Sequence, residues 1–224
     1  MSISDDISAN RDLILNRIGE AAQAVGRSVD SVELVAVSKR QPEARIDAAL
    51  DAGQRVFGEN RVQEAQQHWA ERREKFSDLE LRLIGPLQSN KVTDAVALFD
   101  VIESVDREKL ARVLASEMSR QDRQLRLYVQ VNTGEEEQKS GLAPAALPAF
   151  LSLCRDELGL EIEGLMCIPP VEEPAGLHFS LLAKLAREND ISKLSMGMSA
   201  DYETAIQLGA SSVRVGTAVF GSRD

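Results

Sequence analysis

Residues 32–42 read VELVAVSKRQP, a run of branched apolar residues that ends on Ser38, Lys39 and Arg40 before Pro42. An apolar run of this length, followed by polar and turn-forming residues, is typical of a buried strand. A lysine is rarely placed next to a buried element unless its amine has a chemical task or reaches water. The role of Lys39 therefore depends on where in the fold this strand ends.

The same pattern, an apolar run followed by a polar turn and a helical stretch, recurs along the whole chain. In residues 106–120, for example, Leu110, Val113, Leu114 and Met118 fall at the spacing of a helix that packs on a sheet. The apolar runs are ELVAVS (33–38), RVF (55–57), LRLIG (81–85), FDVIES (99–104), LRLYVQVN (125–132), EIEGLMC (161–167), KLSM (193–196) and SVRVG (212–216).

Strands that alternate with helices pair in parallel through right-handed crossovers. Eight such units in 224 residues predict a single (β/α)8 barrel, of the TIM type, in one domain over residues 1–224. Almost no helix follows the last run, so an additional N-terminal helix is expected to cover the barrel there. Its apolar positions are Ile7, Ile14, Ile18, Ala21 and Ala22. The Pro-rich stretch IPPVEEPAG (168–176) is expected to be a loop within this domain.

Charge and cysteine content narrow the function classes. A formal net charge of −10 disfavours nucleic acids and anionic membrane surfaces as partners and favours a small molecule. The only cysteines, Cys154 and Cys167, are too few for a disulfide framework and indicate a reducing compartment. The N-terminus carries acidic residues, and no apolar run has membrane-spanning length. We therefore expect a cytoplasmic protein, and a monomer.

In barrels of this kind the active site lies at the C-terminal ends of the strands. In chain order, the segments that follow the strands are Lys39, GEN (58–60), GPLQSNK (85–91), Glu103 with Ser104, NTGEEEQKSG (132–141), CIPP (167–170), GMS (197–199) and GTAVFG (216–221). The residues that could react with or bind a ligand are therefore expected to lie together on one rim of the barrel.

Lys39 is the most reactive candidate on this rim. Partial burial, and the like charge of Arg40 beside it, favour the neutral amine, which can attack an aldehyde and form a Schiff base. The same pattern also fits a strand-end lysine whose ammonium reaches water.

The last two loops have the features of a phosphate site, which such barrels often build after strands seven and eight. Gly197 allows a close backbone approach, and Ser199 is expected to be the N-cap of the next helix. Arg214, Gly216 and Thr217 follow in the final run. An ordinary capped helix and a glycine that only closes the barrel would give the same pattern. Combined with the strand-end lysine, both loops suggest a phosphorylated aldehyde as ligand.

Other polar residues carry weaker signals. Asn60 could bond a ligand but is more often a helix cap, and Glu59 could be a base or a solvated acid. Lys139 lies in an acidic loop that is expected to be solvated. His68 and His178 both fall within predicted helices, so we expect neither a metal site nor a nucleophilic triad.

Six ordered motifs resemble those of the pyridoxal phosphate homeostasis protein family, whose fold is similar to the N-terminal barrel of alanine racemase. The motifs are AVSKRQP, FGENRVQEA, LIGPLQSNK, VNTGEEEQKSG, GLMCIPP and LSMGMSADYETAIQLGASSVRVGTAVFG, and they cover the chain from about residue 10 to 221. Many relatives have an aromatic residue in place of Arg61 and a histidine in place of Arg82, so this chain departs from the pattern in its pocket lining.

This resemblance implies that Lys39 carries pyridoxal 5′-phosphate, a form of vitamin B6, as a Schiff base. By matching motifs, it implies that Ser199, Gly216 and Thr217 hold the phosphate and that Arg214 lies near the phosphate or the ring. Asn60 and Met196 would line the cofactor, and Lys139 is a weaker candidate for a role in cofactor exchange.

The resemblance also bears on catalysis. A racemase of the related fold takes a second base, a tyrosine, from a second domain, whereas this sequence ends just after strand eight. Tyr128 and Tyr202 fall in predicted strand five and in the helix after GMS. We therefore expect a non-catalytic carrier that buffers pyridoxal phosphate and delivers it to apo-enzymes. The alternatives are a low-activity amino-acid racemase and a cofactor-free enzyme whose Lys39 forms a Schiff base with a sugar phosphate.

Overall fold

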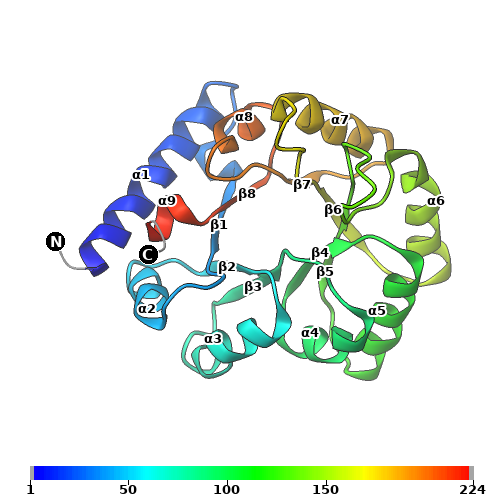
Figure 1. The fold of residues 1–224 in the computed structure, drawn as a ribbon, viewed down its shortest axis with the longest axis horizontal. Helices are drawn as coiled ribbons and strands as arrows, with labels where there is room; N and C mark the ends of the chain where they lie inside the picture. Colours follow the sequence, from blue (N-terminus) through cyan, green and yellow to red (C-terminus); the bar gives the residue numbers. More distant parts are fainter. Residues whose placement is uncertain (1–2, 222–224) are drawn as a thin grey trace.

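The computed structural model of the protein describes residues 3–221. Eight parallel strands pair in chain order, and the last pairs with the first to close a barrel (Figure 1). The strands are β1 (Glu33–Val37), β2 (Val56–Glu59), β3 (Glu80–Leu83), β4 (Val101–Val105), β5 (Arg126–Gln130), β6 (Ile162–Met166), β7 (Lys193–Ser195) and β8 (Ser212–Val215). The predicted (β/α)8 barrel is confirmed, and each predicted apolar run contains one strand or overlaps it.

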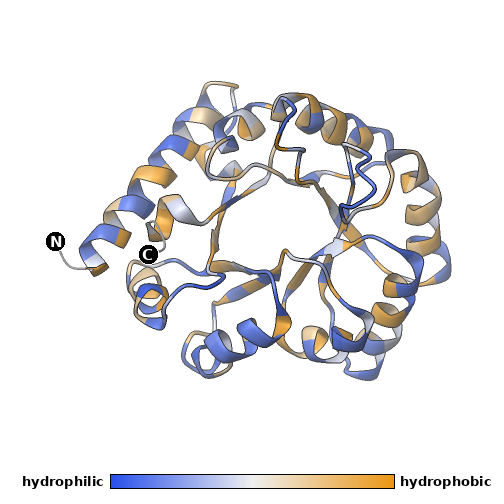
Figure 2. Ribbon diagram, in the orientation of Figure 1, coloured by the Kyte–Doolittle hydropathy of each residue, from blue (hydrophilic) through white to orange (hydrophobic). Residues whose placement is uncertain are grey.

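The helices lie around the outside of the barrel (Figure 1). They are α1 (Ile3–Gln23), α2 (Glu43–Asp51), α3 (Val62–Lys75), α4 (Val92–Leu98), α5 (Glu108–Arg120), α6 (Leu147–Ser152), α7 (Ala175–Glu188), α8 (Tyr202–Gln207) and α9 (Thr217–Phe220). Short helical turns η1 (Val29–Ser31), η2 (Ser89–Lys91), η3 (Pro144–Ala146) and η4 (Leu153–Glu157) complete the connections. Figure 2 shows apolar and hydrophilic residues alternating along these helices, as expected of elements with one face on the sheet.

The two faces of the barrel wall differ in chemistry. Leu81 and Leu83 are fully buried and belong to the apolar core between strands and helices. Because side chains alternate along a strand, Arg82 between them points to the opposite face, into the barrel. The interior of this barrel therefore contains charged side chains, unlike the layers of branched apolar residues that commonly fill such barrels.

Helix α1 closes the gap that the short final unit leaves. It contacts α2, α8 and α9, and Figure 1 shows it lying along the part of the wall formed by β8 and β1. Its predicted apolar positions are buried, and the side-chain amide of Asn10 donates to the carbonyl of Val219 at 3.2 Å. The predicted covering role of the N-terminal helix is confirmed.

Both cysteines are unpaired and buried, as the sequence predicts. Burial raises the pKa of the Cys154 thiol to about 11 and that of Cys167 to about 12, so both behave as small apolar residues at neutral pH. Within residues 3–221 no helix has the length and apolar character needed to cross a membrane.

The packing of α1 can be tested with two substitutions on that helix. Ile18 is 1% exposed and Leu13 is 52% exposed. We expect Ile18→Ala to lower the free energy of unfolding by about 2–5 kcal/mol, because it leaves a cavity against the barrel. Leu13→Ala should change it by less than about 0.5 kcal/mol. Urea denaturation followed by circular dichroism measures both, and equal losses would contradict this packing.

Candidate functional site

The end of β1 is fastened to β2 just before Lys39. The N–H of Ser38 donates to the carbonyl of Gly58 at 3.1 Å, and its hydroxyl donates to Oε1 of Glu59 at 2.7 Å. Lys39 follows in a turn and is half-buried, and the chain then reverses at Arg40, which has a positive φ of 56°. Lys39 therefore lies at the carboxyl rim of the barrel, as the sequence predicts.

Barrel closure brings the last loop against this strand end. Ala36 of β1 pairs with Val215 of β8. A Cβ placed on the next residue, Gly216, would lie 3.4 Å from both the Cβ and the carbonyl oxygen of Val37. Gly216 therefore packs against β1 two residues before Lys39, and the exposed Thr217 follows it at the start of α9.

The loop after β7 also lies at this part of the rim, next to β8. The N–H of Arg214 donates to the carbonyl of Gly197 at 3.0 Å, which ties this loop to β8. Gly197 has a φ of +92°, and a Cβ there would lie 2.6 Å from Cβ of Ala205 and 2.9 Å from Cα of Tyr202. Only glycine fits this close turn onto α8.

The predicted cap of α8 is wrong. Asp201, rather than Ser199, occupies the N-cap position, and its Oδ1 accepts the N–H of Met198 at 2.6 Å. Ser199 is exposed in the turn that precedes the helix. The helix begins two residues later than a Ser199 cap would require.

Asn60 lies between two cavities on this rim. The first, of about 300 Å³, is lined by Asn60 with Lys39, Arg40, Arg61 and Glu64. The second, of about 610 Å³, also contains Asn60 and extends over the ends of β3 and β4, where Pro86, Gln88, Lys91 and Arg107 line it. The structure thus brings Asn60 and Lys39 to one cavity.

The backbone of Asn60 is held from the neighbouring loop. A Cβ on Gly85 would lie 2.3 Å from the carbonyl oxygen of Asn60, so the loop after β3 can approach this closely only through glycine. Arg61, rather than Asn60, is the N-cap of α3, and its side chain makes no capping hydrogen bond. The prediction that Asn60 is more often a cap does not hold here.

Arg214 is not exposed at the rim. It is 4% exposed, and its guanidinium donates to the hydroxyl of Ser195 at 2.6 Å and to the carbonyl of Cys167 at 2.7 Å. Both acceptors lie at the ends of β6 and β7, so the cation lies inside the mouth of the barrel. Met196 is fully buried in the apolar core between strands and helices, behind the rim.

Below Arg214 lies a buried ion network centred on Glu103. Oε1 of Glu103 accepts from Arg82 at 3.1 Å, and Oε2 accepts from Ser195 at 2.6 Å and is 3.9 Å from Arg214. Burial disfavours the charged form of Arg82, but the carboxylates of Glu103, Glu33 and Glu80 outweigh it and raise the pKa of Arg82. Glu103 and Ser104 were expected after strand four, and the structure corrects this, since both lie within β4 and are buried.

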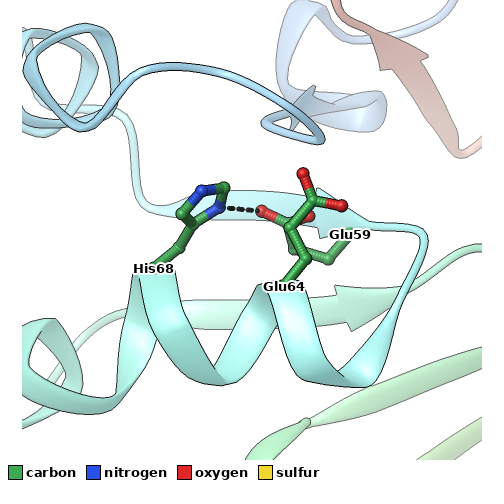
Figure 3. A group of neighbouring side chains, drawn as sticks. All are labelled: Glu59, Glu64 and His68. Atoms are coloured by element: carbon green, nitrogen blue, oxygen red, sulfur yellow. Dashed lines mark hydrogen bonds and ion pairs between the residues drawn. The ribbon is translucent and has the colours of Figure 1, made fainter.

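Glu59 is not a solvated loop acid. It lies at the end of β2 with a fully buried side chain, and its Oε1 accepts from Ser38 and, at 3.0 Å, from Nε1 of Trp69. The same oxygen is 3.0 Å from Nδ1 of His68, and this hydrogen bond raises the pKa of His68. Helix α3 also brings Glu64 to this group (Figure 3), where it accepts the backbone N–H of Arg40.

The sequence pattern predicts no metal site, so this group is not expected from the sequence. Glu64 and His68 are four residues apart, which places them on one face of a helix, and this spacing was the available signal. Ligand atoms of Glu59, Glu64 and His68 all lie within 4.8 Å of one another, a spacing that could hold a metal ion.

The remaining candidates lie apart from this group. Lys139 forms an ion pair with Glu136 at 2.6 Å in the loop after β5. His178 is buried in α7, with Nδ1 3.1 Å from the hydroxyl of Thr133. Tyr128, inside the barrel, is 3% exposed, and burial is the main cause that raises its pKa.

Comparison with known proteins identifies relatives over the whole fold. The family model described as alanine racemase, N-terminal domain, matches residues 12–224. A pyridoxal phosphate homeostasis protein of Pseudomonas aeruginosa is 43% identical over 97% of this chain and 96% of its own length. One from Escherichia coli K12 is 37% identical over 98% of each chain.

Solved structures agree with this grouping. PipY of Synechococcus elongatus, in a structure with PLP bound, is 38% identical with a TM-score of 0.79, covering 93% of this chain and 100% of its own. Alanine racemase of Clostridium difficile has a TM-score of 0.75 at 15% identity, over 98% of this chain and 57% of that one. The latter likeness shows a shared fold only.

Glu103 provides a test of the ion network. Replacing it with alanine leaves Arg82 without one of its carboxylates and Arg214 without its nearest one. We expect Glu103→Ala to lower the free energy of unfolding by about 3–5 kcal/mol, because a buried cation loses its partner. The exposed Glu74→Ala on α3 serves as control and should stay within about 0.5 kcal/mol of the unmodified protein. If chemical denaturation gave a similar free energy of unfolding for both variants, Glu103 would contribute little to stability.

Proposed function

Because this chain belongs to the pyridoxal phosphate homeostasis protein family, we propose that it binds pyridoxal 5′-phosphate on Lys39 and buffers the cofactor for other proteins. The observation that carries the proposal is the grouping of Lys39 with the loops after β7 and β8 on one rim. The register of β8 on β1 and the contact of Gly216 with Val37 support it. PipY, a relative 38% identical to this chain, has a structure with PLP bound, which supports the proposal.

The residues on this rim fit the two reactive ends of the cofactor. Pyridoxal phosphate supplies an aldehyde, which condenses with a neutral amine to form a C=N bond and release water. Lys39 would provide that amine from its half-buried position. Gly197 and Gly216 allow the backbone to approach a phosphate, and the exposed hydroxyls of Ser199 and Thr217 would donate to it.

The barrel mouth would hold the ring. Arg214 is fixed by Ser195 and the carbonyl of Cys167, so its guanidinium would stay in place next to a planar ligand above it. Asn60 lines the cavity that also contains Lys39 and would contact the ligand from the side of β2. Met196 would support the pocket from the core side of β7 rather than expose its side chain to the ligand.

The positions of the two tyrosines favour a carrier role over strong racemase activity. Racemisation needs a proton donor and acceptor on opposite faces of the substrate. Tyr128 lies inside the barrel and Tyr202 is 5% exposed in α8, and burial is the main cause that raises the pKa of each phenol. Neither is suited to exchange protons at the rim. We propose PLP-dependent apo-enzymes as the recipients, a monomer as the working form and the cytoplasm as its location.

The attachment site is tested by absorbance and mass. We expect the protein incubated with pyridoxal phosphate to gain a visible band that borohydride removes, and the reduced adduct to be found by mass on Lys39. Lys39→Ala should lose the band, because Lys39 is the lysine that lines the smaller rim cavity together with Asn60.

Lys193→Ala is the matched control. Lys193 is exposed and starts β7, at the opposite end of the barrel from the rim. This variant should keep the full band. A band retained in Lys39→Ala, or an adduct found on another lysine, would contradict the assignment.

The carrier role is tested by turnover. Loaded protein is incubated with L-alanine or D-alanine, and the other enantiomer is measured by chiral chromatography. We expect a rate no higher than that of the same concentration of free pyridoxal phosphate, because both tyrosines are buried and neither is suited to act as the second base. A rate at least about tenfold higher, abolished in Lys39→Ala, would favour the racemase alternative.

A further inference from the structure

We propose that Glu59, Glu64 and His68 form a binding site for a divalent transition-metal ion, with Zn²⁺ as the best match. The three residues come from two elements, the end of β2 and the first two turns of α3. Figure 3 shows their side chains converging in the space between that strand and that helix. The site adjoins the Lys39 turn but uses none of the residues proposed to hold the cofactor.

The geometry of the ligand atoms suits one ion. Glu64 and His68 lie on the same face of α3, the arrangement by which a helix offers two ligands to one metal. One ligand atom from each residue lies within 4.8 Å of the others. Nδ1 of His68 and Oε1 of Glu59 are 3.0 Å apart, so they need to separate by only a few tenths of an ångström to reach the roughly 3.3–3.6 Å between tetrahedral ligands bound about 2.0–2.2 Å from zinc.

A second observation concerns the other oxygen of Glu59. The Glu59 side chain is 0% exposed, and its Oε2 has no hydrogen-bond partner although Oε1 accepts from Ser38, Trp69 and His68. An unsatisfied buried carboxylate oxygen is costly, and an ion is one of the few partners that remove the cost. Oε2 shares its carboxylate with Oε1, the oxygen 3.0 Å from Nδ1 of His68, so a cation bound by both oxygens of this carboxylate would satisfy it.

The donor set selects the class of metal. One imidazole with two carboxylates suits zinc and its first-row neighbours, whereas Mg²⁺ prefers oxygen ligands and keeps several waters. Three protein ligands leave a fourth position of a tetrahedral ion for water. We therefore expect Zn²⁺ to bind well ahead of Mg²⁺.

The charges around the site bear on its affinity for a metal ion. Lys39, Arg40 and Arg61 line the adjoining cavity and oppose a dipositive ion through space. The two carboxylates of the site offset this only at short range. Binding therefore depends on direct coordination and should weaken clearly when a single ligand is removed.

The ion would act on the turn that carries Lys39. Glu59 accepts the hydroxyl of Ser38, and Glu64 accepts the N–H of Arg40, so two of the three ligands already contact the residues on either side of Lys39. A metal that fixes both carboxylates would fix this turn from both flanks.

Calorimetric titration tests the site directly. The protein as purified is treated with a chelator, exchanged into non-coordinating buffer, and titrated with ZnCl2 and separately with MgCl2. We expect one equivalent of Zn²⁺ to bind and Mg²⁺ to bind at least about tenfold more weakly. Glu64→Gln and His68→Gln should each weaken Zn²⁺ binding by about tenfold or more, since even outer partners of metal ligands typically contribute that much.

Glu71→Gln is the matched control, because Glu71 is exposed on the same helix. It should bind Zn²⁺ as the unmodified protein does, and circular dichroism checks that all variants are folded. The site is refuted if the unmodified protein binds no Zn²⁺ or if both ligand variants retain its affinity. X-ray absorption of the Zn²⁺-loaded unmodified protein gives a test that needs no variant. Nitrogen and oxygen ligands support the site, and sulfur ligands would move the ion to a cysteine and overturn it.

Discussion

The hydrogen-bonded pairing of β8 with β1 is the constraint on which the rest of the structure depends. It runs from Glu33 with Ser212 to Ala36 with Val215 and joins the first strand to the last. Because all strands are parallel, closure sets their carboxyl ends on one rim. Lys39 and Gly216, near opposite ends of the chain, become neighbours only through this pairing. Helix α1 protects it from outside, and without that cover the apolar backs of β8 and β1 would face water.

The closed sheet also encloses a polar interior, because several of its strands point charged side chains into the barrel. Arg82 and Arg214 point inward from β3 and β8, and Glu103 between them accepts from Arg82 and lies 3.9 Å from Arg214. Without that carboxylate Arg214 would lose its nearest acid and Arg82 would keep Glu33 and Glu80, so the charges of the two buried cations would be less well compensated. Closure thus makes Glu103 part of the support for the Arg214 side chain, which in turn lies below the proposed cofactor position. An apolar filling would pack the barrel as well but would offer no fixed cation at its mouth.

The position of α3 connects packing to the chemistry beside Lys39. The rings of Trp69 and Phe57 pack 4.5 Å apart and hold the helix against β2. The same Trp69 donates to Glu59, so the contact that seats the helix also orients a buried carboxylate. Glu64 then reaches the turn at Arg40, whose positive φ of 56° is unusual for a residue with a side chain. The apolar contacts that hold α3 against β2 therefore also position the polar side chains beside Lys39.

The sequence by itself determined the barrel, the order of its strands, the covering role of α1 and the family, because periodicity and motif order are local or cumulative signals. The sequence also placed Lys39 at the rim, because a residue that directly follows a buried strand lies at the carboxyl end of that strand. It did not determine where a helix starts within two residues, and the capping expectations for Ser199 and Asn60 were wrong for that reason.

Only the tertiary structure decided which side chains share an environment. Glu59 reads the same in sequence whether it is solvated or buried, and it became a buried acceptor because Trp69 and His68 pack onto it from α3. Glu103 likewise lies inside β4, where two arginines from other strands meet it. These contacts depend on distances across the barrel wall. A linear pattern can indicate that a residue is polar and that a strand ends near it, but it carries no information on what faces that residue after the sheet has closed.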